Sequence, residues 1–166
     1  MSIVRAKAAY ALLINTVRTV VLGTVNADNV PSISYAPFVI DETKNIYIFV
    51  SEFSTHTFNL QANPKASVML IEDETKSKQI FARRRLTYSC SATKLDKNSI
   101  QWEHIANQFE KRFGNIVYIF RNLPDICIIK FTPYEGIFLM DFGSAYKIKS
   151  DDLNQLIFIA EDETVY

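Results

Sequence analysis

"TVVLGTVNADNVPSISYAPFVI", residues 19–40, is the stretch that indicates the fold class. Residues 19–25 are rich in β-branched side chains, which favours a strand. The Asn, Asp and Pro content of "NADNVP" is typical of a turn, and residues 32–40 alternate like the returning strand of a hairpin. Pro37 has no N–H to donate to a ladder, so it predicts an edge strand or a bulge. The stretch therefore predicts antiparallel β structure.

Outward from this hairpin, apolar periodicity predicts further strands separated by helices. We expect helices over residues 4–17, 55–62 and 98–114, the last extended by "NIVYIFRNLP" after a break at Gly114. We expect strands over residues 46–51, 66–72, 85–95, 125–133 and 136–148, with "TPYEG" as the turn between the last two. Ser150 predicts a cap before a final helix or extended arm. About six or seven short strands predict a mainly β barrel with peripheral helices, formed by a single domain of residues 1–166.

The composition argues against several classes of function. The formal net charge is zero at pH 7, whereas nucleic-acid-binding domains usually carry a basic surface. No apolar run is long enough to span a bilayer, and the four glycines form neither a dinucleotide-binding loop nor a P-loop. Cys90 and Cys127 lie in apolar runs without metal-site spacing, which predicts buried, reduced thiols. We therefore expect a cytoplasmic protein that binds neither nucleic acid nor membrane.

A cluster of polar residues lies where a predicted strand meets a predicted helix, in "SEFSTHTFNL". Its candidate ligand-binding residues are Ser51, Ser54, His56 and Asn59. Hydroxyl groups and free N–H groups at a helix N-terminus can bind an anion. The alternative is a well-capped helix, because Ser and Thr are good N-caps.

Two further sites carry charged residues. Arg83, Arg84 and Arg85 form the densest positive cluster of the chain, and on an extended segment Arg84 would face opposite to the other two. One face could bind an anionic group through bidentate hydrogen bonds, or the run could be solvated and paired with the acids of residues 72–74. Asp125 follows a proline, which is the usual position of a turn acid.

The order of several motifs resembles a known family. "SYAPF", "NLQANP", "IEDE", "FARRRL" and "DFGSAY" follow one another as in the pyridoxamine 5'-phosphate oxidase-like FMN-binding split barrels, and the chain is most similar to their haem-utilisation (HugZ/HutZ) branch. The resemblance covers roughly residues 10–153. It implies a six-stranded split barrel that forms a homodimer. It also implies that a planar ligand, FMN or haem, lies in clefts between the subunits.

The resemblance also implies which residues bind this cofactor. His56 stands where flavin-binding members typically have a lysine, and Arg85 occupies the basic position of the family pattern that lies near the ligand. In the haem branch, the acid matching Asp125 orients an axial histidine. The expected cofactor-binding residues are Ser34, Tyr35, Ser51, Ser54, His56, Asn59, Arg84, Arg85 and Asp125. No catalytic residue and no metal site is predicted.

The chain departs from the haem branch in its last residues. The axial histidine of that branch lies in the C-terminal tail, whereas the histidines here are His56 and His104. Tyr166 is another type of haem ligand. Three functions stay open: haem binding or degradation, FMN-dependent oxidation or reduction, and a split-barrel dimer without catalysis. If haem binds, we expect weak binding without a specific histidine and little degradation.

Overall fold

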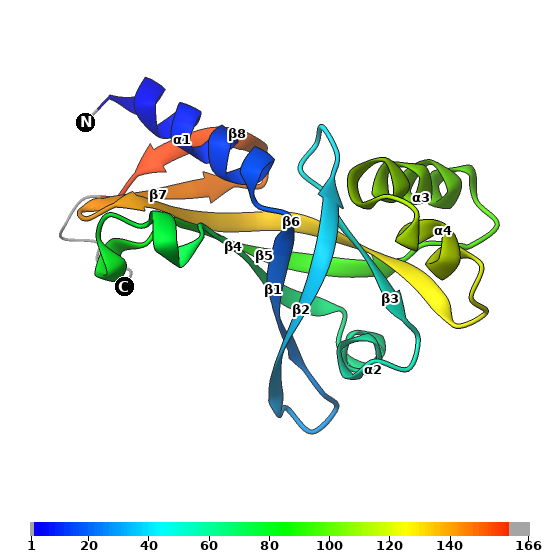
Figure 1. Cartoon of the computed structure of the whole chain (residues 1–166). Helices are drawn as coiled ribbons and strands as arrows, with labels where there is room; N and C mark the ends of the chain where they lie inside the picture. Colours follow the sequence, from blue (N-terminus) through cyan, green and yellow to red (C-terminus); the bar gives the residue numbers. More distant parts are fainter. Residues whose placement is uncertain (1, 160–166) are drawn as a thin grey trace.

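The computed structural model describes residues 2–159 and is built around one antiparallel sheet (Figure 1). The strand order is β3-β2-β1-β4-β5-β6-β7-β8, and β3 also pairs with β6. This additional pairing closes the first six strands into a barrel. The barrel strands are β1 (Thr19–Val25), β2 (Pro31–Ile40), β3 (Ile46–Ser51), β4 (Lys65–Ile71), β5 (Arg85–Lys94) and β6 (Ile126–Asp141). The predicted six-stranded barrel with peripheral helices is confirmed.

Two strands and a helix extend the barrel at one end (Figure 1). Strands β7 (Ser144–Lys149) and β8 (Asp152–Phe158) continue the sheet beyond β6. Helix α1 (Ile3–Thr16) packs against β4, β6 and β8. The buried Tyr10 hydroxyl donates to the Leu153 carbonyl over 2.8 Å and also shares a hydrogen bond with the Tyr88 hydroxyl. Tyr10 therefore fastens α1 to the barrel and to its extension.

The α-helices that follow α1 lie at the opposite end of the barrel (Figure 1). Helix α2 (Thr55–Ala62) contacts β1 and β2, whereas α3 (Ile100–Phe113) packs on β2, β3 and α4 (Ile116–Arg121). Ser99 caps α3 by accepting the Trp102 N–H over 3.1 Å. Two short 3-10 helices, η1 (Glu74–Lys76) and η2 (Ile80–Ala82), lie between β4 and β5. No helix within residues 2–159 is long and apolar enough to cross a membrane.

Alternation along the strands separates an interior from an exterior surface. On β1, Val20, Leu22 and Thr24 are buried and point into the barrel. The residues between them point outward. One outward-pointing row crosses four strands, with Val21 paired to Tyr35 and Met69, and Met69 paired to Thr87. We call the exterior of β2, β1, β4 and β5 the outer face. It leaves two large apolar side chains uncovered, because Ile33 is 84% exposed and Tyr35 is 62% exposed.

The segment predicted as two strands joined by a turn is one strand, β6. Thr132 and Pro133 pair with β5, Glu135 pairs with it again, and the register shifts between Ser89 and Cys90. "TPYEG" is therefore a β-bulge, a feature that tolerates proline and glycine as a turn does. The real turn follows at residues 141–144, where Gly143 has a φ of 67°.

The other predictions about the helices and strands hold except at the C-terminal end of the sheet. The residues after Ser150 form strand β8, so the extended arm is confirmed and the helix is wrong, and the sheet has eight strands instead of six or seven. Helix α4 follows α3 after the predicted break at Gly114, whose φ is 83°. Residues 31–37 of β2 pair with β1 alone, which agrees with the edge position predicted from Pro37. Both cysteines are buried and free, as predicted.

Candidate functional site

The junction between β3 and α2 holds a network of hydroxyl groups. The Ser51 hydroxyl donates to an Asp125 carboxylate oxygen over 2.8 Å. The Ser54 hydroxyl donates to the Ser51 carbonyl over 2.9 Å and lies 2.7 Å from the Thr57 hydroxyl. Ser54 occupies the N-cap position of α2, but its side chain makes no cap hydrogen bond. The hydroxyls therefore hold the junction together, and simple side-chain capping by Ser54 is not their role.

Asp125 joins this junction from the start of β6. Besides accepting from Ser51, it accepts the Glu52 N–H at its own carbonyl over 2.7 Å. The pairing of β3 with β6 places Ser51 opposite Ile126, which brings the two polar residues together. Within a single chain, the Asp125 carboxylate therefore holds the Ser51 hydroxyl in place at the rim of the barrel.

Two buried polar atoms near α2 have no hydrogen-bond partner among the described residues: the Nε2 of His56 and the hydroxyl of Ser34. His56 is 9% exposed, and burial lowers its pKa, so its imidazole is neutral at neutral pH. Asn59, one turn further along α2, donates to the buried Thr24 hydroxyl over 2.9 Å. Buried polar atoms are rarely left unpaired, so the orphaned atoms are the feature of this region that most requires an explanation.

The structure separates Ser34 from its neighbour Tyr35. Ser34 lies opposite the buried Leu22 and points to the same interior side. Tyr35 lies opposite Val21 on the outer face. One ligand on one side of β2 therefore cannot contact both side chains.

The three arginines do not alternate as predicted. Strand β5 begins only at Arg85, and Arg83 ends η2, so the extended alternation does not apply to Arg83 and Arg84. Arg83 pairs with Glu74 over 3.5 Å and donates to the Glu72 carbonyl over 2.8 Å. The alternative considered from the sequence, in which the arginines pair with the acids of residues 72–74, therefore holds for Arg83.

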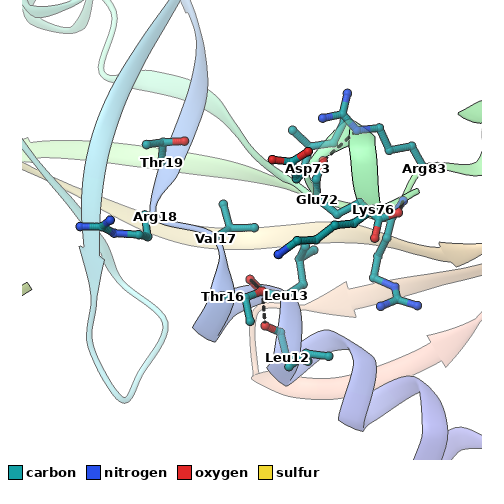
Figure 2. A pocket seen from close by; sticks show the side chains of 12 residues that line it. Leu12, Leu13, Thr16, Val17, Arg18, Thr19, Glu72, Asp73, Lys76 and Arg83 are labelled. Carbon is teal, nitrogen blue, oxygen red and sulfur yellow. Dashed lines mark hydrogen bonds between the residues drawn. The ribbon is translucent and has the colours of Figure 1, made fainter. Parts of the chain in front are cut away.

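Arg84 and Arg85 lie on different surfaces. Arg84 lines a cleft of about 660 Å³ between the end of α1 and the connection from β4 to β5 (Figure 2). Arg85 is the first residue of β5, and because Leu86 is buried inside the barrel, Arg85 lies on the outer face. The sequence did not identify Lys76, which also lines the cleft, because a lysine in a polar loop gives no distinct signal.

The expected site residues therefore form two groups at opposite ends of the barrel. Ser51, His56 and Asp125 belong to the α2 end, where α2 leads directly into β4 at Lys65. Arg85 pairs with Ile71 at the other end of β4. These ends are separated by roughly 20 Å, given about 3.3 Å per strand residue. The two groups do not meet within one chain.

Comparisons with known proteins agree with this architecture. Residues 6–140 match the family model described as pyridoxamine 5'-phosphate oxidase. The chain is 38% identical to a protein named heme oxygenase HutZ from Vibrio cholerae serotype O1, over 144 residues that cover 87% of this chain and 81% of that protein.

Solved structures give the same result. A structure of HutZ from Vibrio cholerae, described there as a haem storage protein, has a TM-score of 0.73 at 35% identity and covers 76% of this chain and 88% of that one. Campylobacter jejuni ChuZ has a TM-score of 0.87 at 27% identity and covers 100% of this chain and 67% of that one. The match of the family model and the similarity to HutZ over most of both chains show that this protein belongs to the pyridoxamine 5'-phosphate oxidase family.

Proposed function

We propose that the protein is a haem-utilisation protein that binds haem in a cleft formed by two copies of the chain. The observation that carries this proposal is the 38% identity to heme oxygenase HutZ over most of both chains. We further propose that it acts in the cytoplasm, which its two buried, free thiols support.

The arrangement of the site residues supports a second copy of the chain. The junction residues Ser51 and Asp125 lie at the opposite end of one barrel from Arg85, so one ligand reaches both only if a partner supplies the missing group. Ile33 and Tyr35 leave the outer face apolar, and exposed apolar patches often mark interfaces. A homodimer that packs outer faces together would bury on the order of 1,600 Å².

The described residues offer a cation for a haem propionate and an apolar surface for the haem ring. Arg85 uses one of its terminal N–H groups for the Arg83 carbonyl, at 3.2 Å, and its other donors can hold a propionate. The apolar side chains of the outer face suit a flat macrocycle. Bound haem would supply the redox chemistry, whereas Arg85 and the junction residues would hold and orient it.

The first prediction concerns Arg85. We expect Arg85→Ala to lower haem affinity about tenfold or more, because it removes a charge-assisted hydrogen bond worth roughly 1.5–3 kcal/mol. Titration of both proteins at the Soret band measures this change. An unchanged affinity for haem and for FMN would remove Arg85 from the site.

The second prediction concerns His56. Its Nε2 is buried, so it cannot reach a ligand on the outer face. We therefore expect the haem affinity of His56→Ala to lie within about threefold of that of the unaltered protein, a difference in binding free energy of under about 1 kcal/mol. Incubation of the haem-loaded protein with ascorbate should give little biliverdin-like product, because neither histidine is placed to bind the haem iron. His104 is hydrogen-bonded to Gln108 on α3, away from the junction residues and from Arg85. Submicromolar haem binding that His56→Ala abolishes would contradict this prediction, and rapid product formation would contradict its catalytic half.

FMN is the alternative ligand. The family description favours it, as do the hydroxyl groups at the start of α2. Those hydroxyls are already engaged with one another, and His56 is neutral. Lys94 lines a pocket together with Thr57 but is paired with Glu52, so a phosphate would have to compete with Glu52 for this cation. An absorption spectrum of the purified protein separates the two ligands, because flavin gives two visible bands and haem gives a Soret band. If the protein shows neither flavin bands nor a Soret band, also after FMN and haem have been added and the unbound ligand removed, a dimer without redox chemistry is favoured.

A further inference from the structure

We propose that the cleft between α1 and the β4–β5 connection is a second binding site, which takes a small organic carboxylate with an apolar body. The cleft measures about 660 Å³, which lies within the usual range for small-molecule sites. It is built within one chain, and Arg85 does not line it. The inference therefore does not depend on haem binding.

One side of the cleft is apolar. Leu12, Leu13 and Val17 of the last turns of α1 and its cap line it, together with Ile71 at the end of β4. Figure 2 shows these α1 residues facing the cleft, with Lys76 extending across it toward Val17 and Leu13. An aliphatic ligand body packed there would be removed from water, which favours binding by about 0.8 kcal/mol per buried methylene.

The other side offers hydrogen-bond donors that no described residue uses. Lys76 makes no ion pair within residues 2–159. Arg84 is held by its Nε, which donates to the Met140 carbonyl over 3.3 Å, and its terminal amino groups make no further hydrogen bond among the described residues. Arg84 is therefore held in place with free terminal amino groups. Lys76 is exposed, and its charge helps to lower the pKa of the neighbouring Asp73 carboxyl.

The two acids that line the cleft already accept hydrogen bonds from neighbouring residues. Glu72 accepts the Arg84 backbone N–H over 2.9 Å, and Asp73 accepts the backbone N–H of Thr75 over 2.9 Å and its hydroxyl over 2.6 Å. Local hydrogen bonds with Thr75 lower the Asp73 pKa, so its carboxylate is ionised at neutral pH.

The charges that face the cleft are balanced, so its preference for an anion rests on free hydrogen-bond donors. Four basic and two acidic residues line the cleft, and Arg83 pairs with Glu74, so the one excess positive charge is that of Arg18. The Arg18 guanidinium lies over the Phe113 ring, 5.1 Å from the centroid, and points away from the cleft in Figure 2. Lys76 and Arg84 are therefore the direct contacts for the carboxylate.

Octanoate is the probe that tests this site, followed by chemical-shift titration of the full chain at fixed low ionic strength. We expect saturable binding that Lys76→Gln and Arg84→Gln each weaken about tenfold, since each removes a charge-assisted contact. Lys78→Gln is the matched control, because Lys78 is exposed in the same connection but does not line the cleft. It should leave the affinity unchanged.

Two uncharged or cationic analogues complete the test. Octanol should bind at least about tenfold more weakly than octanoate, and octylamine should not bind, because only the carboxylate meets Lys76 and Arg84. Equal binding of octanol, tighter binding of octylamine, or no saturable octanoate binding would overturn the inference. So would an equal loss in Lys78→Gln and Lys76→Gln. Haem titration of Lys76→Gln, expected to match the unchanged protein, keeps this outcome separate from the proposed function.

Discussion

Replacing both Ile33 and Tyr35 with Asp is expected to convert the proposed homodimer into a folded monomer. Both side chains are exposed on the outer face of one chain, so the charges cost the isolated barrel little. In a two-fold interface each charge appears twice and is buried without a partner, at several kcal/mol per ion. The dimer dissociation constant should rise on the order of 1,000-fold or more, which light scattering at micromolar concentration measures.

Ile100→Asp provides the matched control for this experiment. Ile100 is 89% exposed at the start of α3, away from the outer face, so the variant should remain a dimer. An unaltered chain that is monomeric at micromolar concentration would contradict the dimer. Equal dissociation of both variants would place the interface elsewhere.

Gly136→Ala is expected to destabilise the barrel strongly. A Cβ atom at this position would lie 2.6 Å from a ring carbon of Tyr88 and 3.0 Å from the Thr87 carbonyl oxygen. Tyr88 is fully buried and hydrogen-bonded to Tyr10, so its ring cannot move away at low cost. Overpacking typically costs about 1–3 kcal/mol or more, which lowers the melting temperature by roughly 2–12 °C for a chain of this size.

Gly23→Ala is the control for the effect of glycine itself. A Cβ atom there would meet its closest neighbour, the Ser67 Cβ, at 3.6 Å, an ordinary contact. Thermal unfolding followed by circular dichroism should show a clearly larger loss for Gly136→Ala. If both variants unfold at the same temperature, the close approach of Gly136 to Tyr88 does not limit stability.

The barrel could be predicted from sequence because its signals are local. Residues 19–40 combine a β-branched strand, a turn and an alternating strand, and the structure pairs Val25 with Pro31 as this pattern requires. "TPYEG" misled the prediction because proline and glycine suit a bulge as well as a turn. Only the pairing partner on β5 distinguishes the two, and that partner is remote in sequence.

The candidate site could be predicted only in part, for a similar reason. Ser51, Ser54, His56 and Asn59 are close in sequence and remain together around α2. Asp125 joins them through the pairing of β3 with β6, which periodicity did not predict. The family resemblance implied only that the acid matching Asp125 orients an axial histidine.

The separation of Arg84 from Arg85 could not be predicted from the residues themselves. It depends on the residue at which β5 begins, and strand boundaries are the least certain part of any sequence-based prediction. Thr24, which binds Asn59, was also missed, because a buried threonine inside a strand resembles any other β-branched residue.

Sedimentation of the protein with added haem, recorded at the Soret wavelength, tests the central claim most directly. It reports in one measurement whether haem is bound and how many chains carry it. The proposed function predicts that the Soret absorbance sediments with a species of twice the 19.0 kDa chain mass. Soret absorbance that stays with free haem, or that sediments with a single chain, would contradict it.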